Sequence, residues 1–289
     1  MARPHSLENL TDHVVICNCN AKVGKIAEEL HTGTLFQPPD VVLLIQDEAL
    51  WQSHPEWHPP ASASGRFYTV TGYPTDKSDL RKVRIKHARA AVILADPNHG
   101  ELADAPSTLT AMAIEKQNPQ VHTVIELVAS SNRCLMEATG VNEIICMREI
   151  SEKLIVQSSL NPGIKNIFED LLTVRQGTSQ LYTITVPSHL TQLTYRQLAQ
   201  KIILADAPFI LIGFVTMNHT NESRNGADDE AVSRPFIRSH QEDTRELHSV
   251  FSQIVINPKV NLNPGKDTVL SSQDRLVIIG HEYPDFQGV

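Results

Sequence analysis

Six short runs rich in Val and Ile constrain the fold of this chain more than any other feature. Each run is mostly apolar, which is typical of strands buried on both faces, as in a parallel sheet that helices cover. The runs lie at 13–17, 40–46, 66–72, 90–96, 122–127 and 142–146. Segments with helical periodicity separate them, so we predict an α/β fold, a Rossmann-like doubly wound parallel sheet, over residues 10–146.

The next segment, residues 148–173, predicts two amphipathic helices separated by the turn Asn161-Pro162-Gly163. A helix pair that leaves a finished α/β domain has little local core to cover. We therefore interpret the pair, bounded at 147–176, as a linking helix-turn-helix that packs on a partner subunit. The residues assigned to this dimer interface are Ile150, Leu154, Ile164, Ile167, Phe168 and Leu171.

From Leu181 the pattern changes to short apolar strands around a single helical segment at 194–203. This predicts a smaller α+β lobe over residues 177–289. Within it, residues 217–247 are polar and low in apolar residues, and we predict a mobile loop there.

The composition excludes several classes of protein. The chain has 289 residues and a net charge of -8, which disfavours a nucleic-acid binder. No apolar run approaches the roughly 18 residues of a membrane-spanning helix, and the N-terminus lacks the apolar region of a secretory signal. The four cysteines are too few for a disulfide framework, so we expect reduced thiols in a cytosolic compartment.

The turn after the first predicted strand lacks the glycines of a dinucleotide-binding site. The G-x-G-x-x-G fingerprint would place glycines where this chain has Asn18, Asn20 and Val23. Asn tolerates a left-handed backbone, so Asn18 can still make the turn, but side chains at 18 and 20 would crowd a pyrophosphate. Two interpretations stay open. Either the turn has drifted in a sheet kept for packing, or its Asn side chains and Cys19 select a different ligand.

Acidic residues follow several of the predicted strands. Asp47, Asp96 and Glu126 lie at carboxyl ends, and Asp104 lies on a following loop. Their combined field could favour a divalent cation in the crevice at that edge of the sheet. The alternative is that these acids are solvated or cap helices.

Two other groups of residues could bind a metal. His54 and His58 are four positions apart, but the prolines around them disfavour a shared helix face, so we expect a surface loop and not a zinc site. We expect Cys17 to lie in the core. Cys19 is expected to face the crevice, where it could be sensitive to oxidation or to metals.

The order of these segments resembles the RCK domain family, the cytoplasmic regulators of potassium channels and related transport proteins. The resemblance rests on three stretches, "HVVICNCNAKVGKIAEEL", "VTGYPTDKSDLRKVRIKHARAAVILADP" and "LIVQSSLNPGIKNIFEDLL". The linking helices and their turn look most similar to those of CASTOR/POLLUX-type channels and their bacterial relatives.

This resemblance implies a regulatory assembly and not an enzyme. Paired RCK domains form a ring, octameric in such proteins, beneath a membrane pore. A ligand that prefers one shape of the ring opens or closes the pore. The implied partners are further copies of the chain and the pore domain of a channel or transporter. The implied location is the cytoplasm, at the inner face of the membrane.

The resemblance also suggests where a ligand binds. Calcium-gated members use an Asp in a Gly-Asp-Pro turn, where this chain has Tyr73 after Gly72, and two acids after the fifth strand, which match Glu126 and Val128. Only one of these three places keeps an acid, which is too few oxygen ligands for that calcium site. The cofactor therefore stays open: a divalent cation such as calcium could bind at Asp96 and Glu126, and NAD or another nucleotide is less favoured. The full predicted ligand-binding set is Asn18, Cys19, Asn20, Asp47, Gly72, Tyr73, Asp96, Asp104 and Glu126.

Three alternative functions stay open. The chain could be a stand-alone subunit of a cation transporter that binds a nucleotide, or a constitutive assembly module without a ligand. An NAD(P)-dependent oxidoreductase is the third alternative, but it would require an intact phosphate-binding turn and a catalytic set of residues.

Overall fold

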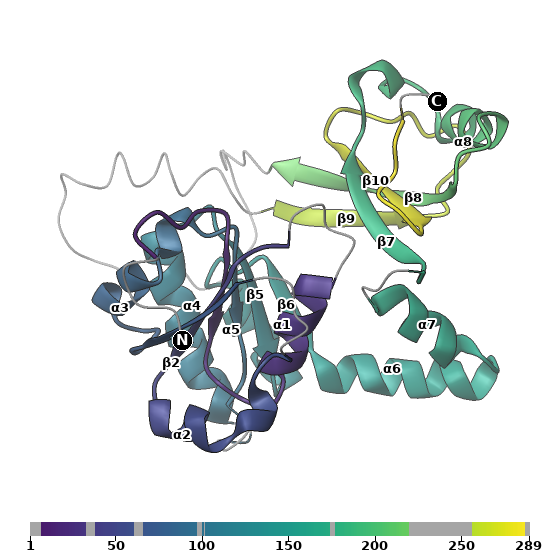
Figure 1. The fold of residues 1–289 in the computed structure, drawn as a ribbon. Helices are drawn as coiled ribbons and strands as arrows, with labels where there is room; N and C mark the ends of the chain where they lie inside the picture. Colours follow the sequence, from purple (N-terminus) through teal and green to yellow (C-terminus); the bar gives the residue numbers. More distant parts are fainter. Residues whose placement is uncertain are drawn as a thin grey trace, which may run out of the picture.

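The computed structural model of the chain describes residues 7–32, 38–60, 66–96, 100, 102–173, 177–219 and 256–286. A six-stranded parallel sheet forms its first part, in the order β3-β2-β1-β4-β5-β6 (Figure 1). This is the strand order of the doubly wound Rossmann architecture, and the predicted fold class is confirmed. The strands are β1 (Val14–Cys17), β2 (Val41–Ile45), β3 (Phe67–Thr71), β4 (Ala90–Ile93), β5 (His122–Leu127) and β6 (Glu143–Cys146).

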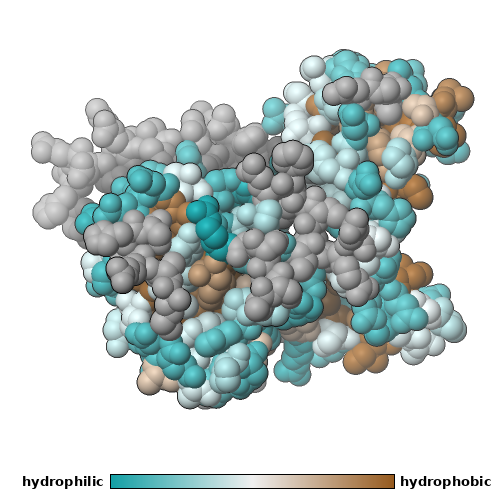
Figure 2. Space-filling model, in the orientation of Figure 1, coloured by the Kyte–Doolittle hydropathy of each residue, from teal (hydrophilic) through white to brown (hydrophobic). Residues whose placement is uncertain are grey.

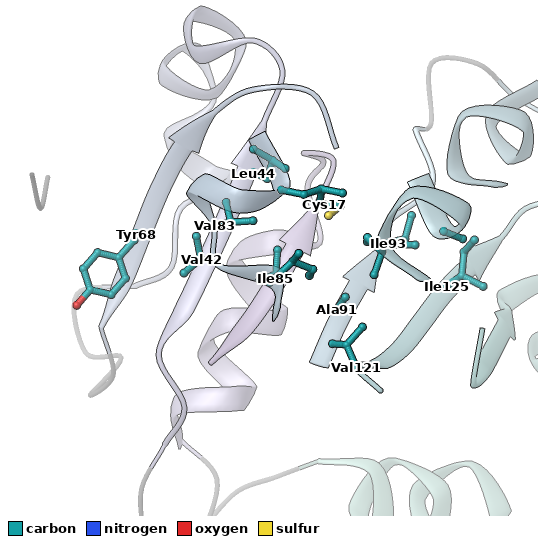
Figure 3. Packing of buried hydrophobic residues seen from close by; sticks show 14 of the residues in the cluster. Cys17, Val42, Leu44, Tyr68, Val83, Ile85, Ala91, Ile93, Val121 and Ile125 are labelled. Carbon is teal, nitrogen blue, oxygen red and sulfur yellow. The ribbon is translucent and has the colours of Figure 1, made fainter. Parts of the chain in front are cut away.

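Helices cover both faces of this sheet because successive side chains along each strand point to opposite sides. Val14 and Ile16 of β1 pack with Val23 of the first helix, whereas Val15 and Cys17 pack on the other face. Figure 3 shows Cys17 in the cluster on that second face. The helices of this part are α1 (Val23–Thr32), α2 (Glu48–Ser53), α3 (Lys77–Lys82), α4 (Asp104–Gln117) and α5 (Arg133–Glu137).

The linking segment consists of α6 (Met147–Leu160) and α7 (Ile164–Leu172), as predicted. Gly163, between them, has φ 92°, a left-handed conformation that glycine adopts without the strain of a side chain. The two helices project from the sheet domain toward the second, smaller sheet (Figure 1). None of the described helices has both the length and the apolarity needed to cross a bilayer.

A four-stranded antiparallel sheet, in the order β7-β10-β8-β9, forms the last part. The core of this lobe lies between the sheet and α8 (Tyr195–Leu204), which starts with a capping box between Thr194 and Gln197. The strands are β7 (Gln180–Thr185), β8 (Phe209–His219), β9 (Ile256–Leu262) and β10 (Asp274–Gly280).

One boundary predicted for this lobe was wrong. The polar loop was expected to begin at 217, but residues 217–219 continue β8 and pair with β9. The remainder of the predicted loop, 220–247, lies outside the described residues.

Candidate functional site

The crevice at the centre of the parallel sheet is where the fold would hold a ligand. The chain leaves β1 and β4 side by side, and the strand order reverses between them. Ligands of doubly wound sheets bind outside the carboxyl ends of the strands at such a point. The turn that follows β1 therefore lies at the position of a nucleotide phosphate site.

Two asparagine side chains close this crevice. Asn18 has φ 69°, the left-handed turn expected from the sequence. Its Nδ2 donates to the carbonyl of Leu94 at 2.7 Å, and Nδ2 of Asn20 donates to the carbonyl of Ala95 at 2.9 Å. Both carbonyls belong to the chain leaving β4. We call this pair of bonds the amide clasp. The two residues that replace fingerprint glycines thus join the two strand ends.

Asn20 also occupies the start of α1. It is only 4% exposed, and its Oδ1 accepts from the amide of Lys22 at 2.9 Å, while its carbonyl accepts from the amide of Val23 at 3.2 Å. Free amides at a helix N-terminus are what bind a pyrophosphate in related folds. Here the chain itself satisfies two of them.

An ion pair covers the clasp on the β5 side. Lys22 pairs with Glu126, whose carboxylate is only 13% exposed and also accepts from the amide of Ala95 at 3.3 Å. A cation at Glu126 would have to displace the Lys22 ammonium. Lys22 was not among the residues that the sequence predicted for the site. Asp96, which follows Ala95 in the segment after β4, is half-buried.

Gly24, the glycine in the first turn of α1, allows another segment of the chain to pack closely against this helix. A Cβ on Gly24 would lie 2.7 Å from the carbonyl oxygen of Trp57 and 2.8 Å from that of His58. Gly24 therefore lets the segment after β2 approach the first turn of α1. The segment around His54 and His58, expected to be a surface loop, is partly helical, because residues up to Ser53 form α2 and Pro55–Trp57 form a 3-10 helix.

The two histidines of this segment are separately engaged. His54 stacks on Trp57 with ring centroids 4.0 Å apart, and His58 stacks on Trp51 at 4.1 Å. Nε2 of His58 lies 3.0 Å from the carbonyl of Trp51. Each ring is thus held by a tryptophan.

Three further predicted ligand residues, Asp47, Gly72 and Tyr73, take part in local structure. Asp47 caps α2 by accepting from the amide of Leu50 at 3.0 Å. The amide of Tyr73 donates to the carboxylate of Asp79 at 2.8 Å, and a Cβ on Gly72 would lie 2.5 Å from that carboxyl carbon. Asp79, the third residue of α3, was not identified from the sequence.

Asp104 lies at the start of α4 and not on a loop as expected. Its side chain is buried, and its carboxylate accepts from the amides of Val128 at 2.9 Å and Ala129 at 3.0 Å. It also accepts from Nδ2 of Asn132 at 2.8 Å. The carboxylate thus joins the start of α4 to the turn after β5.

The predicted acids do not converge on a metal. Within the described ranges, no three His, Cys, Asp or Glu side chains come close enough together to hold an ion. Burial raises the pKa of Cys17 to about 12 and the pKa of Cys19 to about 11, so both thiols stay protonated at neutral pH. A protonated thiol is a poor metal ligand and nucleophile, which argues against the sensitivity expected of Cys19.

The linking helices α6 and α7 carry many exposed apolar side chains. They include Met147, Ile150, Ile155, Val156, Leu160, Ile167, Phe168 and Leu172. No residue of α6 or α7 is buried. Brown, apolar atoms gather at the lower right of Figure 2, where Figure 1 places these helices. Of the six predicted interface residues, Ile150, Ile167 and Phe168 are exposed, and Leu154, Ile164 and Leu171 are half-buried.

One carboxyl outside the crevice titrates near neutral pH. Burial raises the pKa of Glu115, on α4, from 4.5 to about 7, although Oγ1 of Thr123 donates to it at 2.7 Å. The folded state therefore binds more protons than the unfolded state between these two pH values. Stability contributed by the neutral carboxyl is present below pH 4.5 and is lost as the pH rises to about 7.

We expect Glu115→Gln to raise the free energy of unfolding at pH 8 by on the order of 1–2 kcal/mol, because no charge then has to be buried. Between pH 5 and 8 the variant should lose less stability than the unmodified chain. Urea unfolding at several pH values measures this, with the exposed Glu137→Gln as control. Parallel pH profiles for Glu115→Gln and the unmodified chain would contradict the assignment.

Comparison with known proteins relates the sequence of this chain to one family. Residues 9–125 match the family described as "Calcium-activated potassium channel slowpoke-like RCK domain". Over 106 residues the chain is 30% identical to "Probable ion channel CASTOR" of Oryza sativa subsp. japonica, a match that covers 35% of this chain and 12% of that protein. It is 22% identical to "Calcium-gated potassium channel TvoK" of Thermoplasma volcanium, covering 68% and 53% of the two chains.

A solved structure shares the fold over most of the chain. The structure of the human SLO3 gating ring superposes with a TM-score of 0.57 and 15% sequence identity, covering 93% of this chain and 44% of that one. The chain thus spans about an eighth of CASTOR and about half of TvoK.

Proposed function

We propose that this chain, whose residues 9–125 match the RCK domain family, is a regulatory domain that gates a potassium or cation channel from the cytoplasmic side. The observation that carries the proposal is the helix pair α6–α7. It follows the RCK sheet directly and contains no buried residue. An amphipathic pair of this kind is stable in water when a second copy covers its apolar face.

The proposed division of the chain follows from this role. Residues 10–146 form the Rossmann-like lobe, 147–176 the linking helices that pair two copies, and 177–289 the second lobe. Paired copies then associate further into a ring, octameric as the resemblance implies, whose shape acts on a pore domain. The relatives named above are channels, so catalysis is not part of the proposed function.

The nature of the ligand is the second part of the proposal. The amide clasp and the capping of α1 by Asn20 leave a dinucleotide without its usual donors and space. A divalent cation is the candidate that the relatives favour, because TvoK is named as calcium-gated. Glu126 and Asp96 lie at the same edge of the sheet, but the described residues add no third ligand, so the protein alone would supply few of the cation's ligands. The cation would take the place of the Lys22 ammonium on Glu126.

The clasp also favours a second candidate function, a constitutive assembly module whose crevice holds no ligand. Calorimetry on the whole chain with calcium, magnesium, zinc, NAD and ADP separates the two. We expect heat from a divalent cation, at least tenfold weaker binding in Glu126→Gln, and no heat from NAD or ADP. Heat from none of the five would favour the assembly module. Heat from NAD would overturn the closed-crevice argument.

A further inference from the structure

The parallel sheet ends at β3, whose outer edge is open. The carbonyl of Arg66 and the amide of Gly72 bond to β2, so the even-numbered residues between them also face β2. The amides and carbonyls of Phe67, Thr69 and Thr71 consequently point away from the sheet. No other strand pairs with β3 in the part of the chain that the structure describes. Such an edge is a template for one more strand.

A groove runs along this edge. It has a volume of about 490 Å³ and lies between residues 68–71 of β3 and the end of α3, with Leu7 and Glu8 at one side. Figure 3 shows Tyr68 on the outermost strand in view, and its side chain, only 6% exposed, belongs to the buried cluster. The groove therefore offers backbone bonds on one wall and side chains on the other.

The facing wall is cationic. Arg81, Lys82 and Arg84 line the groove against one acid, Glu8. Arg84 donates to the backbone carbonyls of Leu10 and Glu8, which are neutral acceptors, whereas Lys82 pairs with Asp79. These cations belong to a stretch, residues 77–89, with six basic residues and one acid in a chain whose net charge is -8.

We propose that this groove binds an extended acidic segment of a partner protein, which adds to β3 as a further strand. The edge supplies main-chain hydrogen bonds at every second residue, as in other β-addition complexes, and the cations select acidic side chains. The site lies across the sheet domain from α6 and α7, at the strand edge opposite β6. It does not depend on the proposed gating role or on the crevice.

Two substitutions test separate parts of the proposal. Thr69→Pro removes an outward amide and leaves the bonds from β3 to β2, since proline is tolerated on an edge strand when its nitrogen faces away. Arg81→Glu reverses one exposed charge of the wall and cannot disturb the sheet. Lys266→Glu, an exposed reversal in the second lobe, is the matched control.

The probe is a fluorescent eight-residue peptide in which Glu alternates with Val or Thr, titrated into the full chain and followed by anisotropy. We expect it to bind at least tenfold more tightly than the same peptide with Lys for Glu. Thr69→Pro and Arg81→Glu should each weaken binding at least tenfold, and Lys266→Glu less than twofold. Hydrogen exchange at Thr69 and Thr71 should slow when the peptide is present.

Three results would overturn the proposal. The first is equal binding of the acidic and basic peptides. The second is undiminished binding by both groove variants. The third is binding to vesicles containing phosphatidylserine, measured by cosedimentation, with no binding of the peptide, which would assign the cations to a membrane surface.

Discussion

Ile167→Asp is expected to dissociate the proposed dimer into monomers. Ile167 is 56% exposed on α7, so an acidic side chain there costs the isolated chain little. In a dimer, however, the carboxylate would be buried in an apolar interface without a partner. We expect the dimer dissociation constant to rise at least 100-fold, the range of a central interface residue. Sedimentation velocity over a range of concentrations measures it.

The control for this variant is Asn166→Asp, which makes the same change in charge at a neighbouring exposed polar position. It should leave association within a fewfold of the unmodified chain. An unmodified chain that stays monomeric at high concentration, or an Ile167→Asp variant that still dimerises, would contradict the assignment of the linking helices. Neither result would bear on the crevice or on the β3 groove.

Asp104→Ala is expected to destabilise the sheet domain by about 2–4 kcal/mol, because it leaves two half-buried backbone amides and one side-chain amide without an acceptor. Urea unfolding measures this loss. Asp267→Ala is the control. Its side chain is 88% exposed, so its ion pair with Arg196 at 3.6 Å should contribute less than about 1 kcal/mol.

This variant also separates two roles of Asp104. The sequence places it among candidate ligands of the crevice, whereas its contacts are those of a structural cap. If Asp104→Ala unfolds at the same urea concentration as the unmodified chain but loses a ligand response, the carboxylate is a ligand. A large loss of stability with no ligand involved supports the cap.

The regular elements could be predicted from the sequence, since they depend on local pattern. Apolar runs of strand length identified β1 to β6, and Asn161-Pro162-Gly163 identified the break between α6 and α7. The segment at 48–57 was missed because its prolines were taken to exclude helix. In fact α2 ends before Pro55, and the approach of this segment to Gly24 is a tertiary contact that no local pattern encodes.

The crevice shows most clearly which features follow from the sequence and which depend on tertiary contacts. The sequence alone determined that the turn after β1 lacks phosphate-binding glycines and that Asn18 could adopt a left-handed backbone, because both are properties of single residues. Only the tertiary structure decided what those side chains do. The carbonyls that Asn18 and Asn20 bind belong to Leu94 and Ala95, more than 70 residues away along the chain. Those partners become neighbours only when β1 and β4 pair, so the closed crevice is a product of strand order.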